Sequence, residues 1–278
     1  MRCGFYPALE FPLRRKNPLQ MKFPRLIQAL VLVLLGCVIL PRGGAEPDAS
    51  LHLYLLVGQS NMAGRGMVDE ESKKSDPRIL MLTKELQWQP ATDPLHFDKA
   101  IAGVGPGLAF AKAIAEKTPG VRIGLIPCAV GGTSIKLWVP EGFDKFTKTR
   151  PYADMLERVK VAQREGVLKG IIWHQGEADR NATDAYAGLL AELIERMRKD
   201  CGAEVPFVAG EISSFQSQTE DSTIKLNAAI HSLEGKVKQY AWVGSEGLNH
   251  KGDQVHYDSA SARILGVRFA DKMLSLQK

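Results

Sequence analysis

A serine that directly follows a buried strand is the first residue of this sequence that could do chemistry. Ser60 stands two positions after Gly58, at the end of the almost continuous apolar run 51–57. A glycine here permits a tight turn, which exposes the serine at the carboxyl edge of a sheet, where a nucleophile is expected. The G-x-S-x-G elbow is absent, because Met62 occupies the place of the second glycine. A serine that only caps a turn or a helix is the alternative interpretation.

A candidate base for this serine lies near the other end of the chain. A serine hydroxyl is a weak nucleophile until a base accepts its proton, and a carboxylate orients that base. Asp253 and His256 stand three positions apart before the last predicted helix, so they can hydrogen-bond and leave one imidazole nitrogen for Ser60. His250 competes for the role of base, and Asp258 is a candidate helix cap. Turn chemistry or a surface pair is the alternative for the Asp-x-x-His spacing.

Two further segments offer hydrogen-bond donors for the oxyanion that forms during ester hydrolysis. In segment 128–134, the backbone N–H of Gly131 can approach a substrate with no side chain in the way. Segment 171–179 presents an imidazole, an amide and a carboxylate from His174, Gln175 and Glu177. Taken alone, each segment also fits a structural role, as a glycine turn or a capped helix start.

Buried strands and amphipathic helices alternate along the chain and would position these groups. The apolar runs predict strands at 51–57, 121–127, 170–174, 205–209 and 239–243. The predicted helices are 107–117, 152–165, 184–199, 221–233 and 259–276. This alternation indicates a parallel sheet covered by helices on both faces. Each candidate group follows a predicted strand, and ligands of such sheets bind beyond the carboxyl ends of the strands. The stretches 63–104 and 139–150 break the alternation and are predicted to be long loops that are either functional or partly disordered.

The four segments, taken in order, resemble the SGNH hydrolase superfamily. They are most similar to the sialate O-acetylesterase-like group, which includes the acetyl xylan esterases of carbohydrate esterase family 6. The resemblance spans about 51–272 and rests on Gly58-Gln59-Ser60-Asn61-Met62, Gly131-Gly132-Thr133-Ser134, Trp173-His174-Gln175-Gly176-Glu177 with Asp179, and Asp253-Gln254-Val255-His256 with Asp258-Ser259-Ala260. It implies a three-layer α/β/α sandwich with a parallel, flavodoxin-like sheet of about five strands, and neither a metal nor an organic cofactor.

The resemblance also implies roles for individual residues. Ser60 would be the nucleophile, His256 the base and Asp253 the orienting acid. The oxyanion hole would comprise the Ser60 N–H, a backbone N–H near Gly131 and the side chain of Gln175, which stands where other SGNH enzymes carry asparagine. The supporting residues would be Gln59, Asn61, Gly132, Thr133, His174 and Glu177, with Glu177 positioning the 174–175 loop. The implied substrate is an acetylated carbohydrate hydrolysed through an acetyl-enzyme, and the identity of the sugar stays open.

Two other classes of protein are weighed against an esterase. One is a carbohydrate-binding protein that keeps the fold without the activity. The other is a metal-dependent hydrolase that would use His174, Glu177, His250, Asp253 and His256. Those residues lack a His-x-x-x-His helix pair or a comparable ligand spacing. The insertion 63–104 and the aromatic residues Trp138, Trp173 and Tyr257 are predicted walls of the pocket, with burial in the core as the alternative for the aromatic residues.

The N-terminus has the pattern of a secretory signal. A basic start, the apolar run 26–40 and the small residues Gly43 and Ala45 predict cleavage after Ala45. The apolar run is shorter than the roughly 20 residues of a membrane span, although an uncleaved anchor is the alternative. The mature protein would then be a secreted or periplasmic single domain, 46–278. Met21 is a second candidate start, which would make residues 1–20 an upstream extension.

Charge and cysteine content limit the partners of the mature chain. Seven of the 36 Lys and Arg residues, but only one of the 31 acidic residues, fall within 1–45, so the rest of the chain is close to neutral. A nearly neutral body implies no basic face for nucleic acid, and no membrane partner is expected after signal removal. Cys128 and Cys201 remain of four cysteines, and a disulfide or two buried thiols fit equally well. The oligomeric state stays open.

Overall fold

Seven strands form one sheet in the order β3-β2-β4-β1-β5-β6-β7. The computed structural model describes residues 46–213, 215 and 220–278, so the predicted signal segment 1–45 lies outside the described residues. The strands are β1 (Asp48–Gly58), β2 (Ile79–Leu82), β3 (Trp88–Pro90), β4 (Arg122–Pro127), β5 (Gly166–His174), β6 (Phe207–Gly210) and β7 (Tyr240–Val243). Neighbouring strands are parallel except β3, which pairs antiparallel with β2. Strands β4-β1-β5-β6-β7 reproduce the 2-1-3-4-5 order of a flavodoxin-like sheet, as predicted.

Two of the seven strands were not predicted, because both lie in the insertion 63–104. Strand β2 has four residues and β3 has three, and no helix stands between them, so the strand–helix alternation that marks the equally short β6 and β7 is missing. β2 adds to the edge of the sheet beside β4, with Ile79 opposite Ile123. The insertion therefore extends the sheet and is not only a loop.

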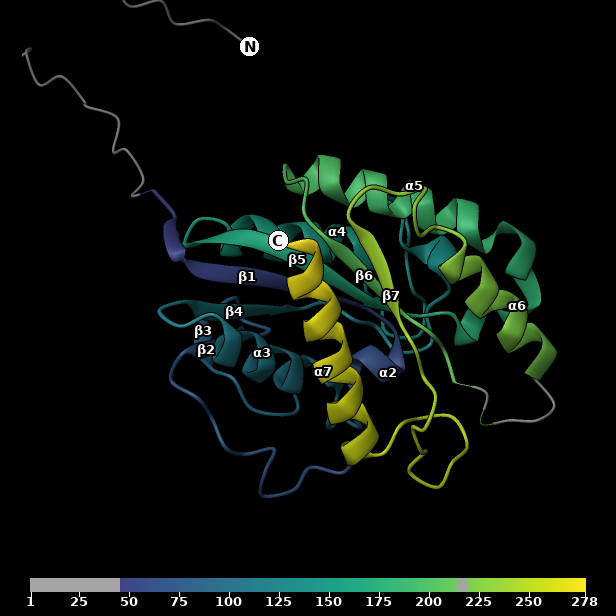
Figure 1. Ribbon diagram of the computed structural model, residues 1–278, viewed down its shortest axis with the longest axis horizontal. Helices are drawn as coiled ribbons and strands as arrows, with labels where there is room; N and C mark the ends of the chain where they lie inside the picture. Colours follow the sequence, from purple (N-terminus) through teal and green to yellow (C-terminus); the bar gives the residue numbers. More distant parts are fainter. Residues whose placement is uncertain (1–45, 214, 216–219) are drawn as a thin grey trace, which may run out of the picture. The chain divides into compact units, whose positions relative to one another are not determined.

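The helices cover both faces of the sheet. They are α2 (Ser60–Ala63), α3 (Pro106–Lys117), η1 (Ile135–Leu137), α4 (Pro151–Ala162), η2 (Glu177–Ala182), α5 (Thr183–Cys201), α6 (Glu220–His231) and α7 (Ser259–Leu276). Figure 1 shows α3 and α7 on one face and α4, α5 and α6 on the other, which confirms the three-layer α/β/α sandwich. Among residues 46–213, 215 and 220–278, none of the helices combines the length and the apolar character that crossing a membrane requires.

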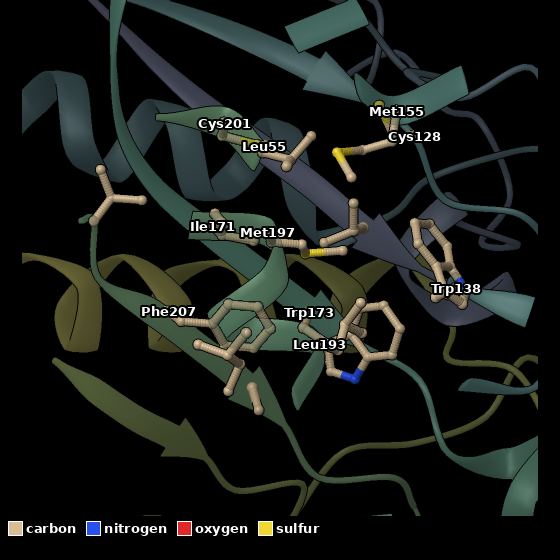
Figure 2. Close-up of a cluster of buried hydrophobic side chains, with 14 of the residues drawn as sticks. Leu55, Cys128, Trp138, Met155, Ile171, Trp173, Leu193, Met197, Cys201 and Phe207 are labelled. Atoms are coloured by element: carbon tan, nitrogen blue, oxygen red, sulfur yellow. The ribbon is translucent and has the colours of Figure 1, made fainter. Parts of the chain in front are cut away.

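The two faces of β1 build two separate cores. Side chains alternate along a strand, so Leu53 and Leu55 face α4 and α5 whereas Tyr54 and Leu56 face α3 and α7. Figure 2 shows part of the core on the α4–α5 face. Both faces of this central strand are buried, and its carboxyl end therefore has a fixed place in the molecule.

Cys128 and Cys201 belong to the core on the α4–α5 face and are labelled in Figure 2. Both are free thiols, which settles the choice that the sequence left open. Burial raises the pKa of Cys128 to about 11 and that of Cys201 to about 12. Both thiols therefore stay protonated and unreactive near neutral pH.

Candidate active site

The turn from β1 into α2 places Ser60 at the carboxyl edge of the sheet. Gly58 has φ +135°, and a Cβ there would collide with the carbonyl oxygen of His174 at the end of β5. The next residue, Gln59, donates its backbone N–H to that same carbonyl at 2.9 Å. Glycine is thus required for the close approach of the two strand ends. Ser60 is the first residue of α2 and borders a pocket.

The hydroxyl of Ser60 meets the imidazole of His256 across 196 positions of sequence. The distance from Ser60 Oγ to His256 Nε2 is 3.1 Å. On its other side, His256 Nδ1 lies 2.8 Å from Oδ2 of Asp253. The three side chains form the continuous serine–imidazole–carboxylate chain that activates a serine nucleophile.

Asp253 is held by the backbone of its own loop. Its Oδ1 accepts hydrogen bonds from the N–H groups of Val255 and His256 at 3.0 and 2.8 Å. Burial alone would raise the pKa of Asp253, but the hydrogen bonds from the His256 backbone and ring and from Val255 outweigh it and hold the pKa well below its usual value. Gln254, between them, has φ +56°, a left-handed conformation that non-glycine residues seldom adopt. This turn brings the carboxylate and the imidazole of the loop together.

Asn61 clamps the backbone on both sides of His256. Its Nδ2 donates to the carbonyl of Val255 at 3.2 Å, and its Oδ1 accepts from the N–H of Tyr257 at 3.1 Å. The same Nδ2 donates to Oε1 of Glu177 at 2.6 Å. Glu177 was predicted to position the 174–175 loop, and the structure instead shows it fixing the amide orientation of Asn61. Both residues thereby support the base.

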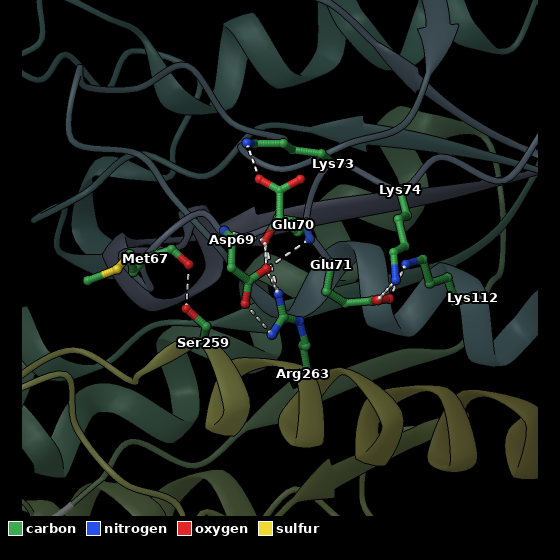
Figure 3. A network of polar contacts seen from close by, with 10 residues as sticks. Met67, Asp69, Glu70, Glu71, Lys73, Lys74, Lys112, Ser259 and Arg263 are labelled. Atoms are coloured by element: carbon green, nitrogen blue, oxygen red, sulfur yellow. Dashed lines mark hydrogen bonds and ion pairs between the residues drawn. The ribbon is translucent and has the colours of Figure 1, made fainter.

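The insertion ties down the helix that follows His256 (Figure 3). Arg263 of α7 donates from Nη1 and Nη2 to the two carboxylate oxygens of Asp69, at 3.0 and 2.6 Å. One turn earlier, the Ser259 hydroxyl donates to the carbonyl of Met67 at 2.6 Å. Asp258 caps this helix by accepting from the N–H of Ser261, as its alternative role predicted. The segment 67–72 and the start of α7 are therefore tied together by side-chain hydrogen bonds.

The predicted oxyanion donor Gly131 already has an acceptor. Its N–H donates to Oδ2 of Asp98 at 2.9 Å, and Asp98 forms an ion pair with Arg65 at 2.6 Å. The side chains of this pair are 1% and 2% exposed. A Cβ on residue 131 would collide with the Arg65 guanidinium, so the glycine makes room for the ion pair. Arg65 and Asp98 come from the insertion, which is why the sequence motifs did not reveal them.

Gln175 does not reach the pocket, in contrast to its predicted place in the oxyanion hole. Its carboxamide is fully buried, and Nε2 donates to Oε1 of Gln59, the carbonyl of Thr133 and Oδ2 of Asp179 at 3.1, 3.0 and 2.6 Å. Its Oε1 accepts from the Tyr186 hydroxyl at 2.9 Å. The longer glutamine side chain thus lies beneath the pocket and holds Gln59 and the loop at residue 133.

A pocket of about 360 Å³ opens in front of Ser60. Its lining is Gln59, Ser60, Arg65, Lys99, Ile101, Gly131, Gly132, Glu177, Ala178, Arg180, Val255 and His256. Among the described residues, none accepts a hydrogen bond from the backbone N–H of Ser60 or Gly132, or from Nε2 of Gln59. The Oε1 of Gln59 accepts from Gln175 and from the N–H of Ala178, so its Nε2 is the end left free.

Several other predicted residues lie outside the pocket. His174 is fully buried, and this burial lowers its pKa. His250 does not compete for Ser60, because His256 contacts that hydroxyl and His250 does not line the pocket. The aromatic residues predicted as walls, Trp138, Trp173 and Tyr257, are all buried away from the pocket. The insertion does supply walls, as predicted, through Arg65, Lys99 and Ile101.

The sequence analysis also missed Asp179 as an organising residue. Its carboxylate accepts from Gln175, from the Ser134 hydroxyl and from the N–H of Ile135. It therefore joins the two loops that follow β4 and β5. The only sequence signal was its place in the 173–179 motif. In the part of the chain that the structure describes, no group of three or more His, Cys, Asp or Glu side chains is arranged to bind a metal ion.

The chain is similar to known carbohydrate esterases. The family model described as "Carbohydrate esterase, sialic acid-specific acetylesterase" matches residues 50–275. A probable carbohydrate esterase of Arabidopsis thaliana is 31% identical over 254 residues, which cover 83% of this chain and 93% of that protein. An X-ray structure of an Arabidopsis thaliana protein is 30% identical to this chain and has a TM-score of 0.70. The match covers 81% of this chain and 98% of the Arabidopsis chain. A carbohydrate acetylesterase from Xanthomonas citri, 19% identical with a TM-score of 0.62, shares the fold over 81% of this chain and 56% of its own.

Proposed function

The chain belongs to the family of carbohydrate esterases described as sialic acid-specific acetylesterases, and we propose that it removes O-acetyl groups from a carbohydrate through an acetyl-enzyme on Ser60. The observation that carries this proposal is the hydrogen bond between Ser60 Oγ and His256 Nε2, with Asp253 behind the imidazole. An inactive carbohydrate-binding protein would have no need to keep these three side chains in register.

The reaction has two steps that use the same groups. His256 accepts the proton as Ser60 Oγ attacks the acetyl carbonyl, and the tetrahedral intermediate then collapses as His256 returns the proton to the departing sugar oxygen. Water next attacks the acetyl-enzyme with His256 again as base, which releases acetate and restores Ser60. Asp253 keeps Nδ1 protonated and stabilises the imidazolium that forms in each step.

The oxyanion needs donors that have no internal acceptor. The backbone N–H groups of Ser60 and Gly132 and the Nε2 of Gln59 meet this condition at the wall of the pocket. Gly131 and Gln175 then act indirectly. The N–H of Gly131 is bound to Asp98, and Gln175 orients the side chain of Gln59. Preorganised donors of this kind account for about 10²–10³ in turnover each.

We also propose that residues 1–45 are a secretory signal and that 46–278 act as one exported domain. The basic and apolar pattern of the segment supports this, together with the position of β1, which begins at Asp48 just after the expected cleavage point. Sequencing the N-terminus of the exported protein tests it. An intact Met1 or Met21 on that protein excludes cleavage.

The decisive experiment measures acetate release by the protein and by its Ser60→Ala variant. Acetylated xylan and O-acetyl sialic acid serve as the two carbohydrate substrates, and p-nitrophenyl acetate reports the bare chemistry. The wild-type protein should release acetate from at least one carbohydrate, and Ser60→Ala should abolish hydrolysis of every ester with little change in melting temperature. Activity of the variant near the wild-type level contradicts the nucleophile assignment.

A further inference from the structure

A second pocket adjoins the one in front of Ser60. It measures about 360 Å³, within the range of small-molecule sites of about 300–1,000 Å³. The two pockets lie on either side of the segment 96–101: His96 and Phe97 line the second pocket, and Lys99 and Ile101 line the first. Asp98 lines the second pocket and accepts the hydrogen bond of Gly131, which lines the first. A ligand bound in one pocket is therefore a close neighbour of a ligand in the other.

The second pocket has a rigid aromatic side. The Phe97 ring is 39% exposed, and the guanidinium carbon of Arg158 lies 4.7 Å from its centroid. Arg158 is itself fixed by three hydrogen bonds to the backbone carbonyls of Leu82, Thr83 and Pro127 at 2.7, 2.9 and 3.1 Å. The ring is thus held in place before any ligand arrives, and little conformational entropy would be lost when a ligand packs on it.

The floor and the rim of this pocket differ in polarity. Met155 and Val130 contribute buried apolar surface to the lining. At the rim stand Lys84, Asp154 and Glu157, all exposed. Lys84 and Glu157 have no hydrogen-bond or ion-pair partner among the described residues. A pyranose matches this arrangement, because its ring has an apolar face and its hydroxyl groups point outward to donors and acceptors. With Asp98 and Arg158 counted as well, the lining carries three carboxylates and two cationic groups, and this excess of negative charge disfavours an anionic ligand.

We propose that this second pocket binds a neutral sugar residue next to the acetylated residue of the same glycan chain. The proposal rests on the proposed function, because it takes the acetylated residue to be bound in front of Ser60. It follows that the enzyme acts better on acetylated oligosaccharides than on acetylated monosaccharides. Phe97 supplies the stacking surface, and Glu157 and Lys84 bond the hydroxyl groups.

Phe97→Ala tests the pocket with three substrates: short acetylated xylo-oligosaccharides, acetylated methyl xyloside and p-nitrophenyl acetate. On the oligosaccharides kcat/KM should fall about tenfold, or ~1.4 kcal/mol, mainly through KM. On the two smaller esters it should stay unchanged, and Phe97→Tyr should restore the oligosaccharide activity. Phe146→Ala is the matched control, because that ring is 94% exposed and does not line the pocket. Glu157→Ala, an exposed and unpartnered position, should give a smaller loss of the same selectivity.

An equal loss on all three substrates, or no loss on any, overturns the proposal. Failure of the proposed function looks different, since the wild-type protein would then cleave p-nitrophenyl acetate but no acetylated carbohydrate. In that case calorimetry with unacetylated xylo-oligosaccharides and the Ser60→Ala protein decides the matter. Binding that disappears when Phe97→Ala is added supports the pocket, and absence of binding refutes it.

Discussion

The Nδ2 amide of Asn61 lies 2.6 Å from Oε1 of Glu177, and this contact fixes which end of the amide faces the loop of the base. Held in this way, Asn61 donates to the residue before His256 and accepts from the residue after it. The residue next to the nucleophile therefore positions the base. The buried amide of Asn61 therefore helps to hold Ser60 and His256, which are remote in sequence, within hydrogen-bond distance of each other.

Exchanging the amide and the carboxylate between Asn61 and Glu177 should first impair activity and then partly restore it. Asn61→Asp removes the donor and sets two carboxylates against each other, so kcat/KM on p-nitrophenyl acetate should fall about 10²-fold and the melting temperature should drop. Adding Glu177→Gln supplies a new amide donor and should recover part of both losses. A double variant that is worse than Asn61→Asp alone would show that the contact is not the cause.

Asp253→Asn should lower kcat by about 10³–10⁴, because an amide favours the wrong imidazole tautomer and cannot stabilise the imidazolium. Glu177→Gln keeps an oxygen acceptor for Asn61 and should cost no more than about tenfold. Steady-state rates of the two purified variants on one ester make the comparison. A larger loss for Glu177→Gln would reverse the roles of the two acids.

The left-handed turn at Gln254 should tolerate glycine and reject a β-branched residue. Gln254→Gly relieves the strain at φ +56°, so activity should stay within about twofold of wild type. Gln254→Val adds about 1–3 kcal/mol of strain and should move Asp253 away from His256, with a loss of kcat. Similar rates for the two variants would mean that the loop conformation does not set the geometry of Asp253.

Variants of Gln59 and Gln175 should differ in how they affect activity and stability. Gln59→Met removes the free Nε2, together with the Oε1 that accepts from Gln175 and Ala178, and should lower kcat about 10²–10³-fold while KM changes little. Gln175→Ala removes several buried hydrogen bonds and should also lower the melting temperature by several degrees. Circular dichroism melts beside the kinetic measurements distinguish them. Full activity of Gln59→Met would exclude its Nε2 as an oxyanion donor.

Asp93 should make the protein less stable as the pH rises. Burial raises the pKa of Asp93 to about 7, and its Oδ1 has no hydrogen-bond partner in the described chain. The unfolded carboxyl ionises near pH 4, so stability declines between about pH 4 and pH 7 and then levels off. Asp93→Asn should remove this decline and raise the melting temperature at pH 8. The gain in free energy of unfolding at that pH should be at most about 4 kcal/mol. Parallel melting curves of the two proteins across this range would contradict the assignment.

Much of the fold was predictable because five of its strands are apolar runs that alternate with amphipathic helices and end at chemically distinctive loops. The five parallel strands, the helices between them and the family resemblance are confirmed. Strands β2 and β3 escaped because they are short and no helix stands between them, so they lack the strand–helix alternation that marks β6 and β7, which have four residues each. Their effect on the sheet comes from pairing with β4, a tertiary contact that local pattern does not encode.

The three catalytic residues were also predictable from the sequence, but the contacts around them were not. Motif order indicated that Ser60, Asp253 and His256 belong together, and the structure shows these three side chains in hydrogen-bond contact. The surroundings of Gly131 and Gln175 depend on Asp98 and Arg65 from the insertion and on Asp179. Which donor is free for an oxyanion depends on side-chain contacts between distant segments, and spacing along the chain does not contain that information.

The anchoring of segment 67–72 on helix α7 has a consequence for redesign (Figure 3). The insertion that shapes the entrance for substrate also anchors the helix that follows the loop of the proton acceptor His256. A graft of a foreign insertion, made to change the preferred sugar, would release that anchor and slow the chemistry on every ester. Such a graft has to supply its own hydrogen-bond partners for Arg263 and Ser259. Substrate selectivity and reaction rate therefore have to be redesigned together.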